Sequence, residues 1–152
     1  MSIKDLASQY RAATEEFLTL VSQLKPNDLD KSDGEGWSPR QVIHHLADSE
    51  TQSYARLRRL IAEPGTIIQG YDEGLWANNP TLGYATRDVS TSIEVFRAVR
   101  QSSYELLCEV SEEQLDNLCT HTESGEYSMR NWLNSYIRHP LDHSEQIRHQ
   151  RG

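Results

Sequence analysis

The sequence has few of the features that mark membrane, secreted or nucleic-acid-binding proteins. Its 152 residues contain no long apolar run and no run of basic residues, and only three of the fifteen basic side chains are lysines. With a net charge of −8, the chain is unsuited to binding a phosphate backbone. The missing apolar run argues against a membrane-spanning helix, and residues 1–4 lead into an amphipathic pattern without a signal-peptide core.

Cysteine is scarce as well. Cys108 and Cys119 form neither a CxxC pair nor the spacing of a secreted disulfide framework. Unpaired cysteines are typical of the cytoplasm, so we expect a cytoplasmic protein that binds neither nucleic acid nor membrane. The length suits one domain with a substantial core, which we assign to residues 1–152.

Four amphipathic segments dominate the chain, each with apolar residues at helical spacing. Residues 111–114 form a capping box and predict a short extra helix, and residues 119–127 are expected to form a turn. No β-branched run of four to eight residues indicates a strand. The pattern predicts an all-α four-helix bundle, with helices over residues 2–25, 38–63 and 88–110 and a last helix that opens at Ser128 and has an inner face reaching Ile147.

A long connection over residues 64–88 joins the second and third predicted helices. It is rich in Gly, Asn and Pro and also carries Tyr71 and Trp76. Loops of this length without structure are uncommon and often functional. We therefore expect this crossover to lie across the mouth of the bundle, with Tyr71 and Trp76 roofing a site.

Three histidines predict that site. His139 and His143 lie four residues apart on the apolar face of the last helix, and His45 lies about 60° from the inner stripe of the second. Side chains at i and i+4 are neighbours and can share one ion. Three imidazoles leave one position of a tetrahedral site open, so we predict a metal centre at the open end of the bundle.

Other interpretations of the histidines remain open. The pair on the last helix can be core histidines bonded to Tyr136 or Glu145, and His45 can pair with Asp48. The zinc-protease HExxH motif is absent, because Pro140 follows the first histidine of the pair. The remaining residues of interest are expected to be solvated (His44, His121, His149), packing anchors (Trp37, Trp132) or, less plausibly, soft metal ligands (Cys119 with His121).

A polar seam accompanies His45 along the second helix. Ser49, Gln52 and Arg56 share its sector, and a buried arginine needs partners, so the seam is expected to border a wet cavity. Arg56 suits the carboxylate of a substrate or thiol. Asp48, or Asp142 on the last helix, is a candidate base or orienting group beside the metal.

The chain resembles the DinB/YfiT-like superfamily over most of its length. The resemblance lies in residues 37–49 with Tyr54 and Arg56, in the crossover segments Tyr71-Asp72-Glu73 and Trp76-Ala77, and in residues 125–132 followed by the terminal HxxxH.

The resemblance implies an antiparallel four-helix bundle in which His45, His139 and His143 bind a divalent metal, usually zinc or nickel. It also implies a homodimer. Members of the superfamily include thiol S-transferases that use bacillithiol, mycothiol or glutathione, a metal-dependent isomerase and metal-dependent hydrolases. The chain departs from YfiT-like relatives at Pro140, often Gly there, and at Gln146, often His. Proline removes a backbone bond to Tyr136, which can kink the helix, open the Tyr136 carbonyl to the cavity or disturb the ligands.

These observations predict a metal-dependent enzyme that acts on a small molecule, either a thiol S-transferase with a low-molecular-weight thiol cosubstrate or a hydrolase. The alternative is a non-catalytic metal- or ligand-binding bundle, in which a fourth protein ligand such as Cys119 or Glu50 closes the site. A third possibility is a partner-binding bundle without metal.

Overall fold

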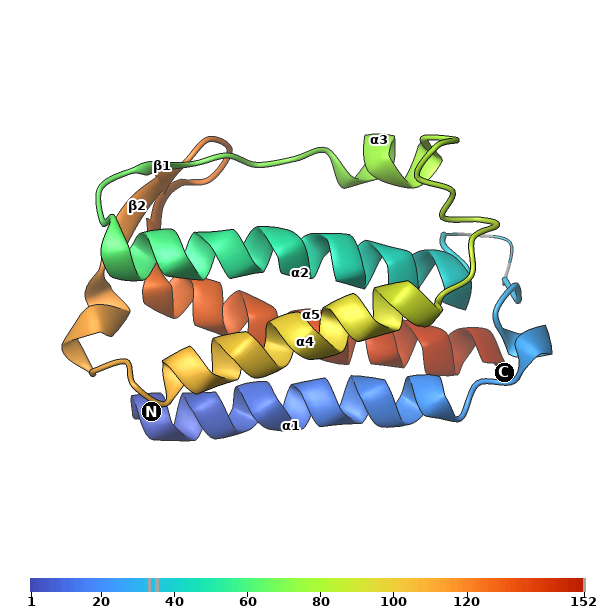
Figure 1. Cartoon of the computed structure of the whole chain (residues 1–152), viewed down its shortest axis with the longest axis horizontal. Helices are drawn as coiled ribbons and strands as arrows, with labels where there is room; N and C mark the ends of the chain where they lie inside the picture. The colour runs from blue at the N-terminus through green and yellow to red at the C-terminus, as the bar shows by residue number, and fades with distance from the viewer. Residues whose placement is uncertain (33, 35, 152) are drawn as a thin grey trace.

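Four long helices build the molecule. The computed structural model describes residues 1–32, 34 and 36–151, and its long helices are α1 (Ile3–Ser22), α2 (Pro39–Ala62), α4 (Ser90–Leu107) and α5 (Met129–Arg151) (Figure 1). The predicted all-α four-helix bundle is therefore confirmed. Shorter elements connect the long helices: 3-10 turns at Pro26–Asp28 and Glu113–Asp116, helix α3 (Glu73–Asn78), and strands β1 (Ile67–Ile68), β2 (Leu118–His121) and β3 (Gly125–Ser128).

Side-chain oxygens accept hydrogen bonds from backbone amides where α2 and α4 begin. At α2 the Ser38 hydroxyl accepts from the Gln41 amide at 3.3 Å, and the Gln41 side chain accepts from the Ser38 amide at 2.9 Å. This is the predicted capping box, with Pro39 at the first helical position. At α4 the cap residue is Val89, and the carboxylate of Asp88 accepts from the Ser90 amide at 2.8 Å.

The helix directions differ from a simple antiparallel bundle. α1 and α5 run one way, and α2 and α4 run the other (Figure 1). α1 packs on α5 and α4, and α2 packs on α4 and α5, so two of the four neighbouring pairs are parallel. The antiparallel arrangement implied by the resemblance holds only for α1 with α4 and α2 with α5.

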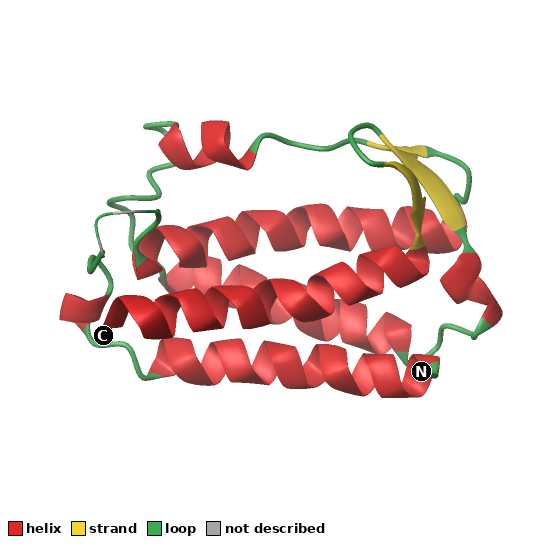
Figure 2. Ribbon diagram, turned by 180° about the vertical axis from the view of Figure 1, so that it is seen from behind, coloured by secondary structure: helices red, strands yellow, loops and turns green. Residues whose placement is uncertain are grey.

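This topology explains the long crossover. Because α2 and α4 are parallel neighbours, the chain must return along the whole bundle between them. The crossover runs beside α2, with β1 near the end of α2 and α3 near its start (Figures 1 and 2). The expectation that it lies across the bundle mouth was wrong, since the crossover covers a side of the bundle.

A small sheet at one end was also missed. β1 pairs in parallel with β2, which pairs antiparallel with β3 (Figure 2). Residues 119–127, expected to be a turn, instead form most of this β2–β3 hairpin, whose turn at residues 122–124 leads into Gly125 with φ +78°. Strands this short carry little periodicity, and β1 lies about fifty residues before β2.

The core fills the bundle with aromatic and aliphatic side chains. Trp132 is fully buried, stacks on Tyr10 with ring centroids 5.8 Å apart, and donates its indole N–H to the Ser53 carbonyl at 3.1 Å. It is thus the packing anchor that the sequence predicts. Among the described residues, no helix combines the length and apolarity needed to span a membrane.

Candidate metal centre

Three histidines from two helices meet at one point. The Nε2 atom of His139 lies 3.1 Å from Nε2 of His45 and 3.2 Å from Nε2 of His143. His45 is in the second turn of α2, and the other two lie on successive turns of one face of α5. The structure therefore brings together the three residues that the sequence selects. Within the described residues they form a group whose ligand atoms all lie within 4.8 Å of one another.

The three imidazoles are suited to metal binding. Burial lowers the pKa of all three, and the nearby His143 ring adds to the effect at His45 and His139. The pKa of His45 falls to about 3. The rings are therefore neutral near pH 7, with nitrogen lone pairs free to coordinate. A set of three neutral imidazoles fits zinc, nickel or a similar divalent ion.

Among the described residues, the opposite ring nitrogen has a hydrogen-bond partner only in His143, whereas Nδ1 of His45 and Nδ1 of His139 are buried without one. Nδ1 of His143 lies 2.8 Å from Oε1 of Gln146 and donates to it, which leaves Nε2 as the ligand atom. Gln146 therefore orients a ligand at the position where the resemblance indicated a lost histidine. The ring of Trp37 packs on His45 with centroids 4.6 Å apart, so this predicted packing anchor also supports the site.

A carboxylate approaches the same point from the crossover. Oε2 of Glu73, the first residue of α3, lies 3.3 Å from Nε2 of His45, and its side chain is 59% exposed. Glu73 belongs to the family motif Tyr71-Asp72-Glu73, but the sequence alone indicates no role for it. α3 has six residues, too few for helical periodicity to predict its packing.

A cavity of about 220 Å³ opens beside His139, lined also by Arg56 and Tyr136. Arg56 donates to the Gln69 carbonyl at 3.1 Å, while its buried Nε–H has no partner among the described residues. Two residues of the polar seam predicted along α2, Ser49 and Arg56, therefore line a cavity beside the candidate metal centre. The remaining lining residues are Tyr127 and Ser135.

Tyr71 and Trp76 pack on each other in the crossover, with ring centroids 4.7 Å apart. The Tyr71 hydroxyl is buried without a hydrogen-bond partner in the described chain. Burial, with the nearby carboxylates of Glu73 and Asp48, raises the pKa of Tyr71. This segment therefore covers the side of the site next to Glu73, and the role of the two rings as a substrate roof stays a prediction.

Asp48 has a different partner from the histidine expected. Its Oδ2 accepts a 2.5 Å hydrogen bond from the buried hydroxyl of Tyr84, near the end of the crossover. The contact ties the crossover to α2 one turn after His45. Asp142, the other candidate, is exposed on α5 next to His143.

Two of the three histidines expected to be solvated are buried. His44 contacts the Ser92 hydroxyl at 2.7 Å and the Arg87 carbonyl at 3.0 Å, because the face of α2 opposite His45 is covered by α4 and the end of the crossover. Nδ1 of His121 accepts from two backbone amides of the β2–β3 turn. His149 is exposed, as predicted.

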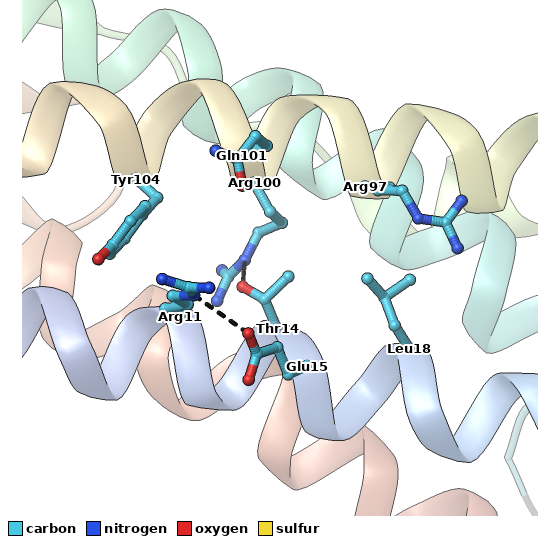
Figure 3. A pocket seen from close by; sticks show the side chains of 8 residues that line it. All are labelled: Arg11, Thr14, Glu15, Leu18, Arg97, Arg100, Gln101 and Tyr104. Carbon is cyan, nitrogen blue, oxygen red and sulfur yellow. Dashed lines mark hydrogen bonds and ion pairs between the residues drawn. The ribbon is translucent and has the colours of Figure 1, made fainter.

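A second cavity, of about 280 Å³, lies between α1 and α4 (Figure 3). Its charged side chains are already engaged: Arg11 pairs with Glu15 at 3.1 Å, and Nε of Arg100 donates to the Thr14 hydroxyl at 2.7 Å. None of the clustered histidines lines this cavity.

A four-helix bundle with a three-histidine centre beside a small cavity defines a class of metal-binding helical proteins. The family model described as the DinB superfamily matches residues 9–147, and the chain belongs to this family.

Its relatives are named for metal-dependent chemistry. A protein of Oceanobacillus iheyensis called "putative metal-dependent hydrolase" is 28% identical over 147 residues, 96% of this chain and 83% of that protein. Another from the same organism, with the same description, is 34% identical over 112 residues, 74% of this chain and 63% of that protein.

The solved structure of YfiT from Bacillus subtilis shares the fold with a TM-score of 0.86 and 26% identity, over 97% of this chain and 85% of that one. It is described as "a probable metal-dependent hydrolase with an unusual four-helix bundle topology". In this chain the parallel α2–α4 and α1–α5 pairs are what distinguishes the topology from an antiparallel bundle.

Proposed function

We propose that this chain is a metal-dependent enzyme that acts on a small molecule, most simply as a hydrolase. The convergence of three neutral histidines beside a cavity of about 220 Å³ carries the proposal. The names of the relatives support it. A divalent ion, zinc or nickel in our proposal, acts at such a centre as a Lewis acid and lowers the pKa of a bound water or thiol.

The chain's own groups have distinct roles in this proposal. His45, His139 and His143 hold the ion, and Gln146 keeps His143 in the correct tautomer. Arg56, which lines the cavity, binds an anionic group of the substrate. Tyr71 and Trp76 exclude water from the side that the crossover covers.

The thiol S-transferase version uses the same residues, with Arg56 holding the carboxylate of a low-molecular-weight thiol. We keep it as a second candidate because Arg56 and His139 line the same cavity, and a guanidinium there fits such a cosubstrate equally well. We further propose that the protein is cytoplasmic, as the sequence leads us to expect, and that it forms a homodimer, as the resemblance implies.

One assay panel separates these candidates. The metal-loaded protein is tested with small esters and amides, with and without a carboxylate, and with a panel of thiols plus a fluorogenic electrophile. Turnover that is lost in His45→Ala and after chelation, and restored in the wild type by added metal, supports the enzyme. Thiol dependence then selects the transferase. Turnover in no arm, with the metal retained, contradicts the enzyme and favours a non-catalytic metal-binding bundle.

A further inference from the structure

We propose that Glu73 is a fourth protein ligand of the metal centre, delivered by α3 and displaceable by substrate. The inference rests on the proposed three-histidine centre and adds a residue that belongs to neither bundle helix of the site. It also assigns a role to the crossover, which carries a ligand and covers the site with the same short helix.

The distances around the site carry this inference. Four tetrahedral ligands at about 2.0–2.1 Å from one ion lie about 3.3–3.4 Å from one another. Nε2 of His139 lies 3.1 and 3.2 Å from its two partners, and Oε2 of Glu73 lies 3.3 Å from Nε2 of His45. The carboxylate oxygen therefore stands at coordination spacing from His45. The group within 4.8 Å consists of the three histidines, so the exposed Glu73 side chain moves closer to His139 and His143 when it binds the ion.

The charge environment agrees with the distances. In the described part of the chain Glu73 pairs with no Lys or Arg, and its one ion-pair partner is His45. A carboxylate placed against the neutral His45 without a cation gains most when an ion lies between them.

The attachment of α3 makes this ligand displaceable. The histidines stand on long bundle helices, whereas Glu73 begins a six-residue helix and is 59% exposed. Asp72 caps α3 by accepting from the Leu75 amide at 2.9 Å, so the carboxylate sits on an ordered turn. Glu73 can leave the ion without unpacking the core, and a carboxylate-bearing substrate bound by Arg56 is suited to replace it.

Metal affinity tests the inference. Dissociation constants for Zn²⁺ and Co²⁺ are measured by chelator competition for the wild type, Glu73→Gln and Asp142→Asn. Asp142 is the matched control, because it is an exposed carboxylate next to His143 on α5. We expect Glu73→Gln to weaken binding at least about tenfold and to shift the visible spectrum of bound Co²⁺, while Asp142→Asn changes both only slightly.

Hydrogen exchange gives a second readout. Added metal should slow exchange of the α3 amides in the wild type and in Asp142→Asn, but not in Glu73→Gln. Equal weakening in both variants, or wild-type affinity and spectrum in Glu73→Gln, overturns the inference and leaves the three-histidine centre standing. Absence of metal binding in the wild type, at the level of His139→Ala, overturns the centre itself.

Discussion

The main-chain carbonyl of Tyr136 accepts a 2.8 Å hydrogen bond from Nη1 of the buried Arg100. Pro140 removes the amide that would donate to this carbonyl within α5, and the arginine replaces it. α5 therefore continues through Pro140 from Met129 to Arg151. The carbonyl is not left open to the cavity, and the two ligands that flank the proline stay on one helix.

The Arg100 guanidinium has further hydrogen-bond acceptors and an aromatic ring around it. It also donates to Oε1 of Glu50 at 3.3 Å and to the Tyr10 carbonyl at 3.0 Å, and its guanidinium lies 3.6 Å from the centroid of the Tyr10 ring. Figure 3 shows the side chain passing from α4 to Thr14 on α1. Both members of the Arg100–Glu50 pair are fully buried, so each depends on the other.

Removing the arginine should therefore destabilise the fold strongly. We expect Arg100→Met to lower the free energy of unfolding by about 3–5 kcal/mol, because it leaves the Glu50 carboxyl and the Tyr136 carbonyl buried without their donor. Urea denaturation measures this. Arg97→Met is the control, since Arg97 lies on the surface of the same helix in an exposed pair with Glu94, and should change stability by less than about 1 kcal/mol.

The effects of Pro140 and Arg100 on the free energy of unfolding should be coupled. In the Arg100→Met background, Pro140→Ala supplies an amide for the Tyr136 carbonyl and should recover about 1 kcal/mol. In the wild-type background the same substitution adds a donor to a carbonyl that Arg100 already satisfies, so the gain should be smaller. Equal effects in the two backgrounds would show that the carbonyl bond does not link the two residues.

Gln146 should matter for metal affinity although it does not reach the ion. We expect Gln146→Leu to weaken Zn²⁺ binding by about 10–100-fold, because Nδ1 of His143 loses the acceptor that fixes its tautomer. Two further variants are compared with it. Gln146→Asn keeps an amide on a shorter side chain, and Glu145→Gln changes an exposed neighbouring residue that pairs with Arg148. Wild-type affinity in Gln146→Leu would contradict this role.

Acid should destabilise the metal-free protein. Burial lowers the pKa of His44, His45, His121, His139 and His143 in the fold, whereas the unfolded chain titrates near pH 6.5. Below about pH 6.5 the unfolded state therefore gains protons that the folded state does not. The free energy of unfolding should fall as the pH drops from 6.5 toward 5 and should not respond to these groups above pH 7.

Urea midpoints of the chelated protein between pH 5 and 8 measure this dependence. The exposed His149 provides the control, since His149→Gln should keep the wild-type slope. A midpoint that is flat or that rises from pH 6.5 to pH 5 would show that the histidines are not held neutral by the fold.

Arg56 should select for anionic substrates. Once an activity is found, Arg56→Met should lower kcat/KM for carboxylate-bearing substrates about tenfold to a hundredfold, the cost of one charge-assisted hydrogen bond. Metal content and the turnover of neutral analogues should change little. Arg59→Met, one turn away on α2 in an exposed pair with Glu63, should leave both substrate classes unaffected. Equal losses for charged and neutral substrates would contradict the assignment.

The sequence predicts the parts of this molecule that depend on local periodicity. Apolar spacing and capping boxes such as Ser38–Gln41 locate the long helices, and helical phasing separates His45 from His44 as the member of the metal group. The same phasing could have found Arg100, which lies at four- and three-residue steps from Phe96 and Ser103 on the buried stripe of α4.

The features missed depend on distant partners. The third strand of the sheet comes from the crossover, where β1 pairs with β2, and the burial of His44 depends on how α4 and the crossover cover α2. Glu73 reaches His45 because the parallel α2–α4 pair sends the crossover back along the bundle. None of these contacts leaves a periodic signal in its own segment.

The central claim is that His45, His139 and His143 hold one divalent ion. The most direct test is elemental analysis of protein purified without a metal-affinity tag, before and after saturation with Zn²⁺ and gel filtration, for the wild type and His139→Ala. We expect close to one ion per chain in the saturated wild type and close to none in the variant. A wild type that retains no metal, or a variant that retains as much as the wild type, would contradict the claim.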